Sequence, residues 1–96
     1  MTDAKLDGAN LSKADLKHAS LRGAYLRKAH LGRADLFAAN LGEAKLSEAY
    51  LAYANLQYAN LRDADLSGAD LEGAVLNGSN LIGATLIGCR VHGTSV

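Results

Sequence analysis

The chain has 96 residues, with no proline, no tryptophan and one cysteine, and its ten basic side chains balance ten acidic ones. One cysteine cannot form a disulfide within the chain, so nothing indicates an oxidising compartment, and we expect Cys89 to be a small core residue. Balanced charge disfavours a general nucleic-acid binder, because phosphate affinity depends on an excess of Lys and Arg. The length predicts a single domain over residues 1–96.

Long apolar runs are also missing. No stretch of eighteen apolar residues occurs, so the sequence predicts no membrane-spanning helix. Residues 1–20 carry Asp3, Lys5, Asp7 and Lys13 where a secretory signal would be apolar. We therefore expect a cytoplasmic protein that does not associate with membranes.

What the sequence has in abundance is a repeat of five residues. Leucine occupies every fifth position from Leu6 to Leu86, and Val91 and Val96 continue the series. The residue two before each leucine is alanine throughout the range 4–74. A period of five scatters leucines around an α-helix and sends them to alternate faces of a flat strand. The chain must therefore bend once in every repeat.

Alanine and leucine lie two residues apart within a repeat, so both can point inward from a short extended segment while the residue between them points outward. The two residues after leucine are left to turn a corner. Repeated corners produce a coil lined with alanine and leucine, whose successive turns stack through parallel backbone hydrogen bonds. The sequence therefore predicts an all-β solenoid.

The repeated unit has the form A-(D/N)-L-x-x, as in the segments 14–16, 39–41, 59–61 and 64–66. This signature resembles the pentapeptide-repeat family over essentially the whole chain. The resemblance implies a right-handed quadrilateral parallel β-helix, with four repeats and twenty residues in each coil. For this chain it implies about five coils.

The corner residues differ along the chain. From Gly68 to Gly93, the second residue after each leucine or valine is glycine, which favours type II turns because glycine adopts positive φ easily. Between residues 13 and 63 the same position holds mostly larger residues, such as Lys13 and Tyr53. We expect type I or irregular corners there.

Asparagine forms a column if the coil takes twenty residues. Residues 20, 40, 60 and 80 then lie above one another on the outside, and three of them are asparagine. Their amides can hydrogen-bond to one another or to neighbouring backbone. We expect this column to stabilise the fold.

Groups that could carry catalysis are few. His18, His30 and His92 occupy different positions of the repeat, without the spacing of a metal site or of a nucleophile and its base. We expect these imidazoles to be solvated. A rigid convex solenoid offers no cleft that excludes water. The sequence therefore predicts a protein that is not an enzyme, with no catalytic residue, cofactor or metal.

The last coil is the most apolar on its outside, which indicates self-association through its rim. In the family that this chain resembles, the dimeric members also make contact at the C-terminal end. We therefore expect a homodimer formed end to end at this coil; the alternative is a monomer whose final turn frays. The candidate rim residues are Ile82, Leu86, Ile87, Val91 and Val96.

Exposed aromatic residues indicate a second surface, because aromatic and arginine side chains are favoured anchors in interfaces. The candidate partner surface comprises Arg33, Tyr50, Tyr53 and Tyr58, and Tyr53 should lie one coil from Arg33 at cation–π range. Phe37 should stand between residues 17 and 57 without an apolar partner. The alternative is that these rings only fill corner steps.

The function predicted from the sequence is a non-catalytic structural or protein-interaction solenoid with an unidentified protein partner. The alternative comes from the resemblance: some pentapeptide-repeat proteins imitate duplex DNA and regulate DNA gyrase, a type II topoisomerase. That imitation needs an acidic surface, whereas residues 21–40 are mainly basic and residues 61–80 mainly acidic. This uneven charge either helps a partner of matching polarity to dock or only keeps the chain in solution.

Overall fold

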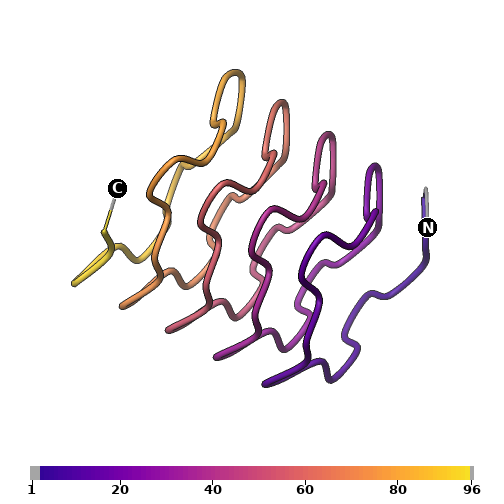
Figure 1. Cartoon of the computed structure of the whole chain (residues 1–96), viewed down its shortest axis with the longest axis horizontal. Coiled ribbons are helices and arrows are strands. Elements are labelled where there is room, and N and C mark those ends of the chain that lie inside the picture. Colours follow the sequence, from indigo (N-terminus) through magenta and orange to yellow (C-terminus); the bar gives the residue numbers. More distant parts are fainter. Residues whose placement is uncertain (1–2, 96) are drawn as a thin grey trace.

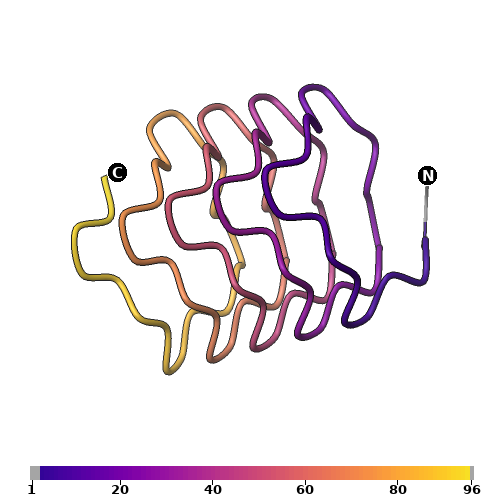
Figure 2. The same ribbon diagram turned by 90° about the horizontal axis from the view of Figure 1, so that it is seen from below.

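A computed structural model describes residues 3–95, which wind into one solenoid without helices in that range (Figure 1). Every fifth residue from Lys5 to Ser95 forms an isolated parallel bridge to the residue twenty positions away, and no longer strand occurs among the described residues. One turn of the solenoid therefore takes twenty residues. The turns lie side by side, with the two ends of the chain at opposite ends of the stack (Figure 2).

Successive turns are referred to below as coils 1 to 5, and they comprise residues 3–20, 21–40, 41–60, 61–80 and 81–95. The predicted strands are reduced to single bridge residues because a four-residue corner occupies most of each repeat. In each corner from residue 6 onward, the N–H of the last residue, usually alanine, donates to the carbonyl three residues earlier, as from Ala39 to Leu36 at 3.0 Å. Four such corners complete one coil.

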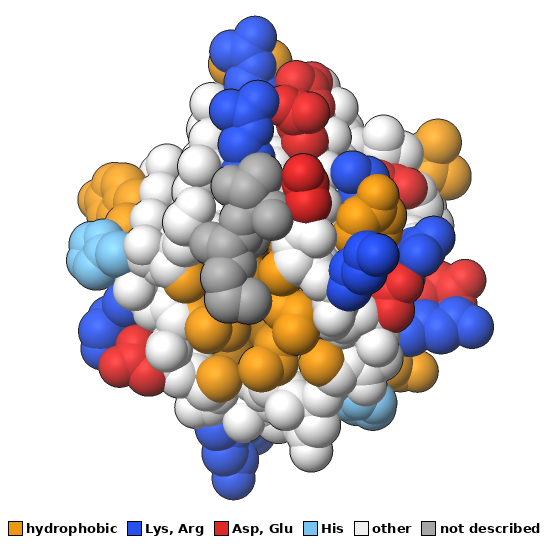
Figure 3. Space-filling model, turned by 90° about the vertical axis from the view of Figure 1, so that its right-hand side faces the viewer, with side chains coloured by type: hydrophobic (Ala, Val, Ile, Leu, Met, Phe, Trp, Pro, Cys, Tyr) orange, Lys and Arg blue, Asp and Glu red, His pale blue; other side chains and the backbone are white. Residues whose placement is uncertain are grey.

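The core is the column of leucines and alanines inside the coils. Leucines from Leu26 to Leu71 are at most 1% exposed, and the alanines between them are equally buried. This confirms the prediction that both residues point inward. Exposure rises at the edges: hydrophobic side chains gather on the N-terminal end face (Figure 3), and Leu86 is 41% exposed in coil 5. Cys89 packs against the core, half-buried, and its Sγ donates to the Leu66 carbonyl.

The corner prediction for residues 13–63 is wrong. The third residue of a four-residue corner lies two positions after the leucine that begins the corner. This third corner residue has positive φ in every described corner, at 56–64° where it is not glycine and at 67–76° where it is glycine. Lys13 and Tyr53 therefore adopt the left-handed conformation that the glycine corners also use.

The hydrogen bonds between coils explain this uniform geometry. From Asp3 to Gly73, the N–H of each third corner residue donates to a carbonyl of the next coil, as from Lys13 to Gly32 and from Arg33 to Ala52, both at 2.9 Å. A corner of another type would misdirect this donor. The left-handed conformation costs about 1–2 kcal/mol for a residue with a Cβ atom, and a hydrogen bond of about 0.5–1.5 kcal/mol offsets it.

Ala38→Gly should consequently stabilise the fold by about 0.5–1 kcal/mol, because it removes a Cβ atom from a residue with φ of 56°. The matched control is Ala52→Gly, at a corner position without positive φ, which should destabilise the chain. Urea unfolding of both variants measures the difference. Equal destabilisation by the two substitutions would contradict the assigned corner geometry.

Where an outward Asn or Asp precedes a leucine, its side chain satisfies the one corner N–H that the backbone leaves unpaired. Asn40 Oδ1 accepts from the Gly42 N–H and Asn60 Oδ1 from the Arg62 N–H, both at 3.0 Å. Asn60 Nδ2 also donates to Asn40 Oδ1 at 3.3 Å, which confirms the predicted asparagine column. The same side-chain-to-backbone bond joins Asn10 to Ser12, Asp15 to Lys17, Asp35 to Phe37, Asn55 to Gln57, Asp65 to Ser67, Asp70 to Glu72 and Asn80 to Ile82.

Candidate functional site

Three exposed tyrosines lie on coil 3. Tyr50, Tyr53 and Tyr58 are 48%, 53% and 64% exposed. Tyr50 is a bridge residue, whereas the other two are third corner residues with positive φ. The backbone under each ring is fixed by hydrogen bonds to coils 2 or 4, as from the Tyr50 N–H to the Ala29 carbonyl.

Tyr53 is held between two neighbouring coils. The guanidinium carbon of Arg33 lies 5.0 Å from the centre of its ring, which confirms the predicted cation–π contact. On the opposite side the ring lies directly over Gly73, where a Cβ atom would overlap it. The ring thus has a charged neighbour on one coil and a glycine on the next, which restricts its rotamers.

Tyr50 stacks on His30, with ring centres 4.8 Å apart and ring planes inclined by 13°. The two residues are also paired as bridge partners in the backbone. The stack was missed from the sequence, which predicts a solvated imidazole at His30. The signal that could have found it is the spacing of twenty residues, which places both rings in one column.

Phe37 has aromatic neighbours, contrary to the prediction that it lacks an apolar partner between residues 17 and 57. Its ring lies edge to face with His18 at 5.9 Å and with Tyr58 at 5.5 Å, measured between ring centres. The prediction was wrong because rings on third corner residues reach the neighbouring second corner position on the adjacent coil. These rings therefore bridge coils 1, 2 and 3 diagonally.

Each tyrosine of the candidate partner surface thus contacts a planar side chain of coil 2. Among residues 3–95, no three His, Cys, Asp or Glu side chains gather in a way that could hold a metal ion. The described residues also contain no helix able to cross a membrane. What the arrangement can do chemically is present rigid, half-exposed rings, which bind a partner at little cost in side-chain entropy.

Charge is distributed unevenly along the solenoid. Residues 1–45 carry eight basic and five acidic side chains, whereas residues 46–96 carry two basic and five acidic ones. The N-terminal half therefore has a net charge of +3, and the C-terminal half has a net charge of −3. A neutral chain thus has opposite charge at its two ends, which can orient an approaching charged molecule.

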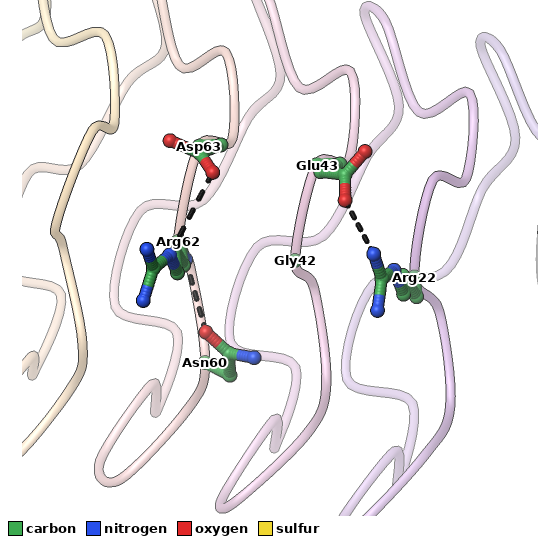
Figure 4. Close-up of a pocket in the computed structure, with 6 residues that line it drawn as sticks. All are labelled: Arg22, Gly42, Glu43, Asn60, Arg62 and Asp63. Atoms are coloured by element: carbon green, nitrogen blue, oxygen red, sulfur yellow. Dashed lines mark hydrogen bonds and ion pairs between the residues drawn. The ribbon is translucent and has the colours of Figure 1, made fainter.

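Two shallow depressions lie outside the tyrosine surface. One, of about 220 Å³, lies over Gly42 between Arg22 and Arg62 (Figure 4). Arg22 pairs with Glu43 at 2.5 Å, and Arg62 lies 3.7 Å from an oxygen of Asp63. Each arginine therefore faces an acidic neighbour, and these surface pairs contribute little to stability.

The other depression, of about 300 Å³, is lined by Lys5, Asp7, Tyr25 and Arg27. Asp7 accepts from the side chain of Arg27 at 2.7 Å and from its backbone N–H at 2.8 Å. The side-chain hydrogen bond from Arg27 lowers the pKa of Asp7 and raises that of Arg27. This exposed pair joins coils 1 and 2.

Stability should fall in acid partly through this carboxylate. The pKa of Asp7 is lower in the folded chain than its usual 3.8, so its contribution is present above that value and is lost as the pH falls through the lowered pKa. Asp7→Asn should therefore show a smaller loss of urea stability between about pH 5 and pH 2.5 than the parent. Asp3→Asn is the control, and equal pH dependence in the parent and Asp7→Asn would contradict the assignment.

The predicted rim residues are exposed in coil 5. Ile82 is 63%, Leu86 41%, Ile87 78% and Val91 58% exposed. Val96, the fifth predicted residue, lies outside the described residues. These side chains lie apart from the tyrosines, so the two candidate surfaces are separate.

Comparisons with known proteins agree with this architecture. A family model described as "Pentapeptide repeats (8 copies)" matches residues 1–33, 29–68 and 59–95. A pentapeptide repeat protein from the thylakoid lumen of Arabidopsis thaliana is 33% identical, with a TM-score of 0.78; the match covers 97% of this chain and 61% of that one. No curated protein sequence matches significantly.

Two cyanobacterial structures are also similar. A pentapeptide repeat protein from Cyanothece 51142 is 38% identical with a TM-score of 0.54, covering 99% of this chain and 62% of that one. Another, from Nostoc PCC 7120, is 40% identical with a TM-score of 0.54, covering 85% and 64%. The chain thus spans about three-fifths of the length of these relatives. It belongs to the pentapeptide-repeat family.

Proposed function

We propose that this chain is a non-catalytic solenoid that binds a protein partner through Arg33, Tyr50, Tyr53 and Tyr58. The observation that carries the proposal is that three half-exposed tyrosines of one coil each contact a side chain of the preceding coil. Interfaces concentrate their binding energy in aromatic and arginine anchors. Rings that are already ordered lose little entropy when a partner covers them.

The roles of the polar side chains support a function without catalysis. The imidazoles of His18 and His30 contact aromatic rings, and Asp35, Asp65 and Asp70 accept backbone N–H groups at corners. These groups are thereby used to hold the coil together. A general base would instead need a free lone pair directed into a site that excludes water.

Imitation of DNA on gyrase is the alternative function, and no observation favours it. Residues 1–45 have a net charge of +3, whereas a DNA mimic needs negative charge along its length. We therefore expect no inhibition of gyrase supercoiling at micromolar concentrations of this chain. Inhibition at such concentrations would replace the proposal by this alternative.

Site-specific photo-crosslinking tests the proposal. A photoreactive phenylalanine at position 53 should capture a protein partner, whereas the same probe at Ser47, at the preceding corner of coil 3, should not. Tyr58→Ala should reduce capture from position 53 by about fivefold or more, since hot-spot residues contribute more than about 1 kcal/mol. Equal capture at positions 53 and 47, or capture from position 53 that Tyr58→Ala leaves unchanged, would contradict the proposed surface.

A further inference from the structure

Both end faces of the solenoid expose the rim of the core. At the N-terminal end, Leu6, Leu11 and Leu16 are only half-buried, and an apolar patch occupies the end face (Figure 3). At the other end, Leu86 and Val91 are exposed. Such apolar rims favour contact with another apolar face.

The backbone hydrogen bonds between coils run in unequal numbers toward the two ends of the solenoid. Between coils 3 and 4, the N–H groups of Leu51 and Tyr53 donate forward to carbonyls of Asp70 and Glu72, both at 2.8 Å. The Asp70 N–H donates backward to the Ala49 carbonyl at 2.9 Å. Each repeat thus makes two forward bonds and one backward bond across every junction.

The two end coils therefore present different edges. The C-terminal edge offers two donors for each acceptor, such as the N–H groups of Leu86 and Gly88, which have no backbone acceptor within residues 3–95. The N-terminal edge offers two acceptors for each donor, such as the carbonyls of Lys5 and Asp7. Unlike edges can satisfy every group, whereas two C-terminal edges leave half of the donors unpaired, which is costly in a buried contact.

Charge favours the same choice. The N-terminal half has a net charge of +3 and the C-terminal half has a net charge of −3, so unlike ends attract and two C-terminal ends repel. Continuing the twenty-residue ladder would place the second copy's Lys5 beside Thr85, and its Asp7 beside Ile87. The apolar rims would cover each other in this register.

We propose that this chain binds a second copy of itself head to tail, with the N-terminal edge of one copy extending the ladder from coil 5 of the other. Each rim is then covered by another copy of this chain, and the two surfaces that meet are different. Such an interface does not close on itself, so assemblies grow beyond the dimer as concentration rises. The end-to-end homodimer expected from the sequence is the competing arrangement.

Substitutions at Ile87 separate the two arrangements. Ile87 is 78% exposed, so a charge there should leave the fold intact, which a thermal melt followed by circular dichroism verifies. In the head-to-tail contact, Ile87→Lys faces the second copy's Asp7 and should raise the association constant about threefold at low salt, whereas Ile87→Asp should lower it about threefold. In a two-fold contact between C-terminal coils, Ile87→Lys brings like charges together and should weaken association.

The measurement is molar mass by light scattering over a concentration series, for the parent and both Ile87 variants. Growth beyond the dimer, strengthened by Ile87→Lys and weakened by Ile87→Asp, supports the proposal. Lys5→Pro should also weaken association, because it removes an N–H that has no backbone acceptor in residues 3–95 but would donate to the second copy. A mass that stops at the dimer and falls with Ile87→Lys, or a monomer at every concentration, would overturn the proposal.

Discussion

Leu56→Asp should abolish folding. Leu56 is fully buried in the middle of the core, surrounded by leucine and alanine, and no basic side chain is buried with it among residues 3–95. An unpaired carboxylate in such surroundings costs several kcal/mol, in addition to the lost burial of the leucine side chain. Because small domains are stable by about 5–15 kcal/mol, the cooperative thermal transition should disappear at neutral pH.

Gln57→Asp is the matched control, because the next residue points outward and is half-exposed. It should melt within a few degrees of the parent, as surface substitutions usually change stability by less than about 0.5 kcal/mol. Circular dichroism follows both melts. A cooperative transition for Leu56→Asp near the parent temperature would contradict the inward direction of the leucines.

Gly73→Val should destabilise the chain by about 3 kcal/mol or more, the second-largest effect expected. Two costs add at this position. A β-branched residue is forced to φ of 67°, where even an unbranched side chain costs about 1–2 kcal/mol. The new Cβ atom also overlaps the ring of Tyr53, which must leave its place against Arg33.

Gly93→Val isolates the first of these costs. Gly93 has φ of 72°, but a Cβ atom there meets only backbone atoms of Gly73, at 3.8 Å or more. Gly93→Val should therefore lose clearly less stability in urea unfolding than Gly73→Val. Adding Tyr53→Ala to Gly73→Val should recover some of the loss, since the ring is then absent. Equal losses at positions 73 and 93, without recovery in the double variant, would show that the ring does not lie over Gly73.

The inward and outward directions of side chains could be predicted from the sequence because they depend on local spacing. Alanine and leucine two residues apart must share a face, and the structure buries both. The asparagine column and the contact of Arg33 with Tyr53 followed from a period of twenty, which places residues in columns.

The corner geometry could not be predicted from residue preference, because contacts between coils decide it. Lys13 and Tyr53 do not favour positive φ, yet their N–H groups must meet carbonyls of the next coil. The neighbours of Phe37 were missed for a related reason. Its contacts with His18 and Tyr58 run diagonally between columns, and their direction depends on the corner geometry.

The central claim is that the tyrosines of coil 3 bind a protein partner, and the affinity of that partner tests it most directly. Once crosslinking has identified the partner, its dissociation constant is measured for the parent and for the triple variant Tyr50→Ser, Tyr53→Ser, Tyr58→Ser. We predict that the triple variant melts like a folded solenoid and binds about a hundredfold more weakly or worse, since three anchors contribute more than about 1 kcal/mol each. Unchanged affinity in a folded triple variant would contradict the claim.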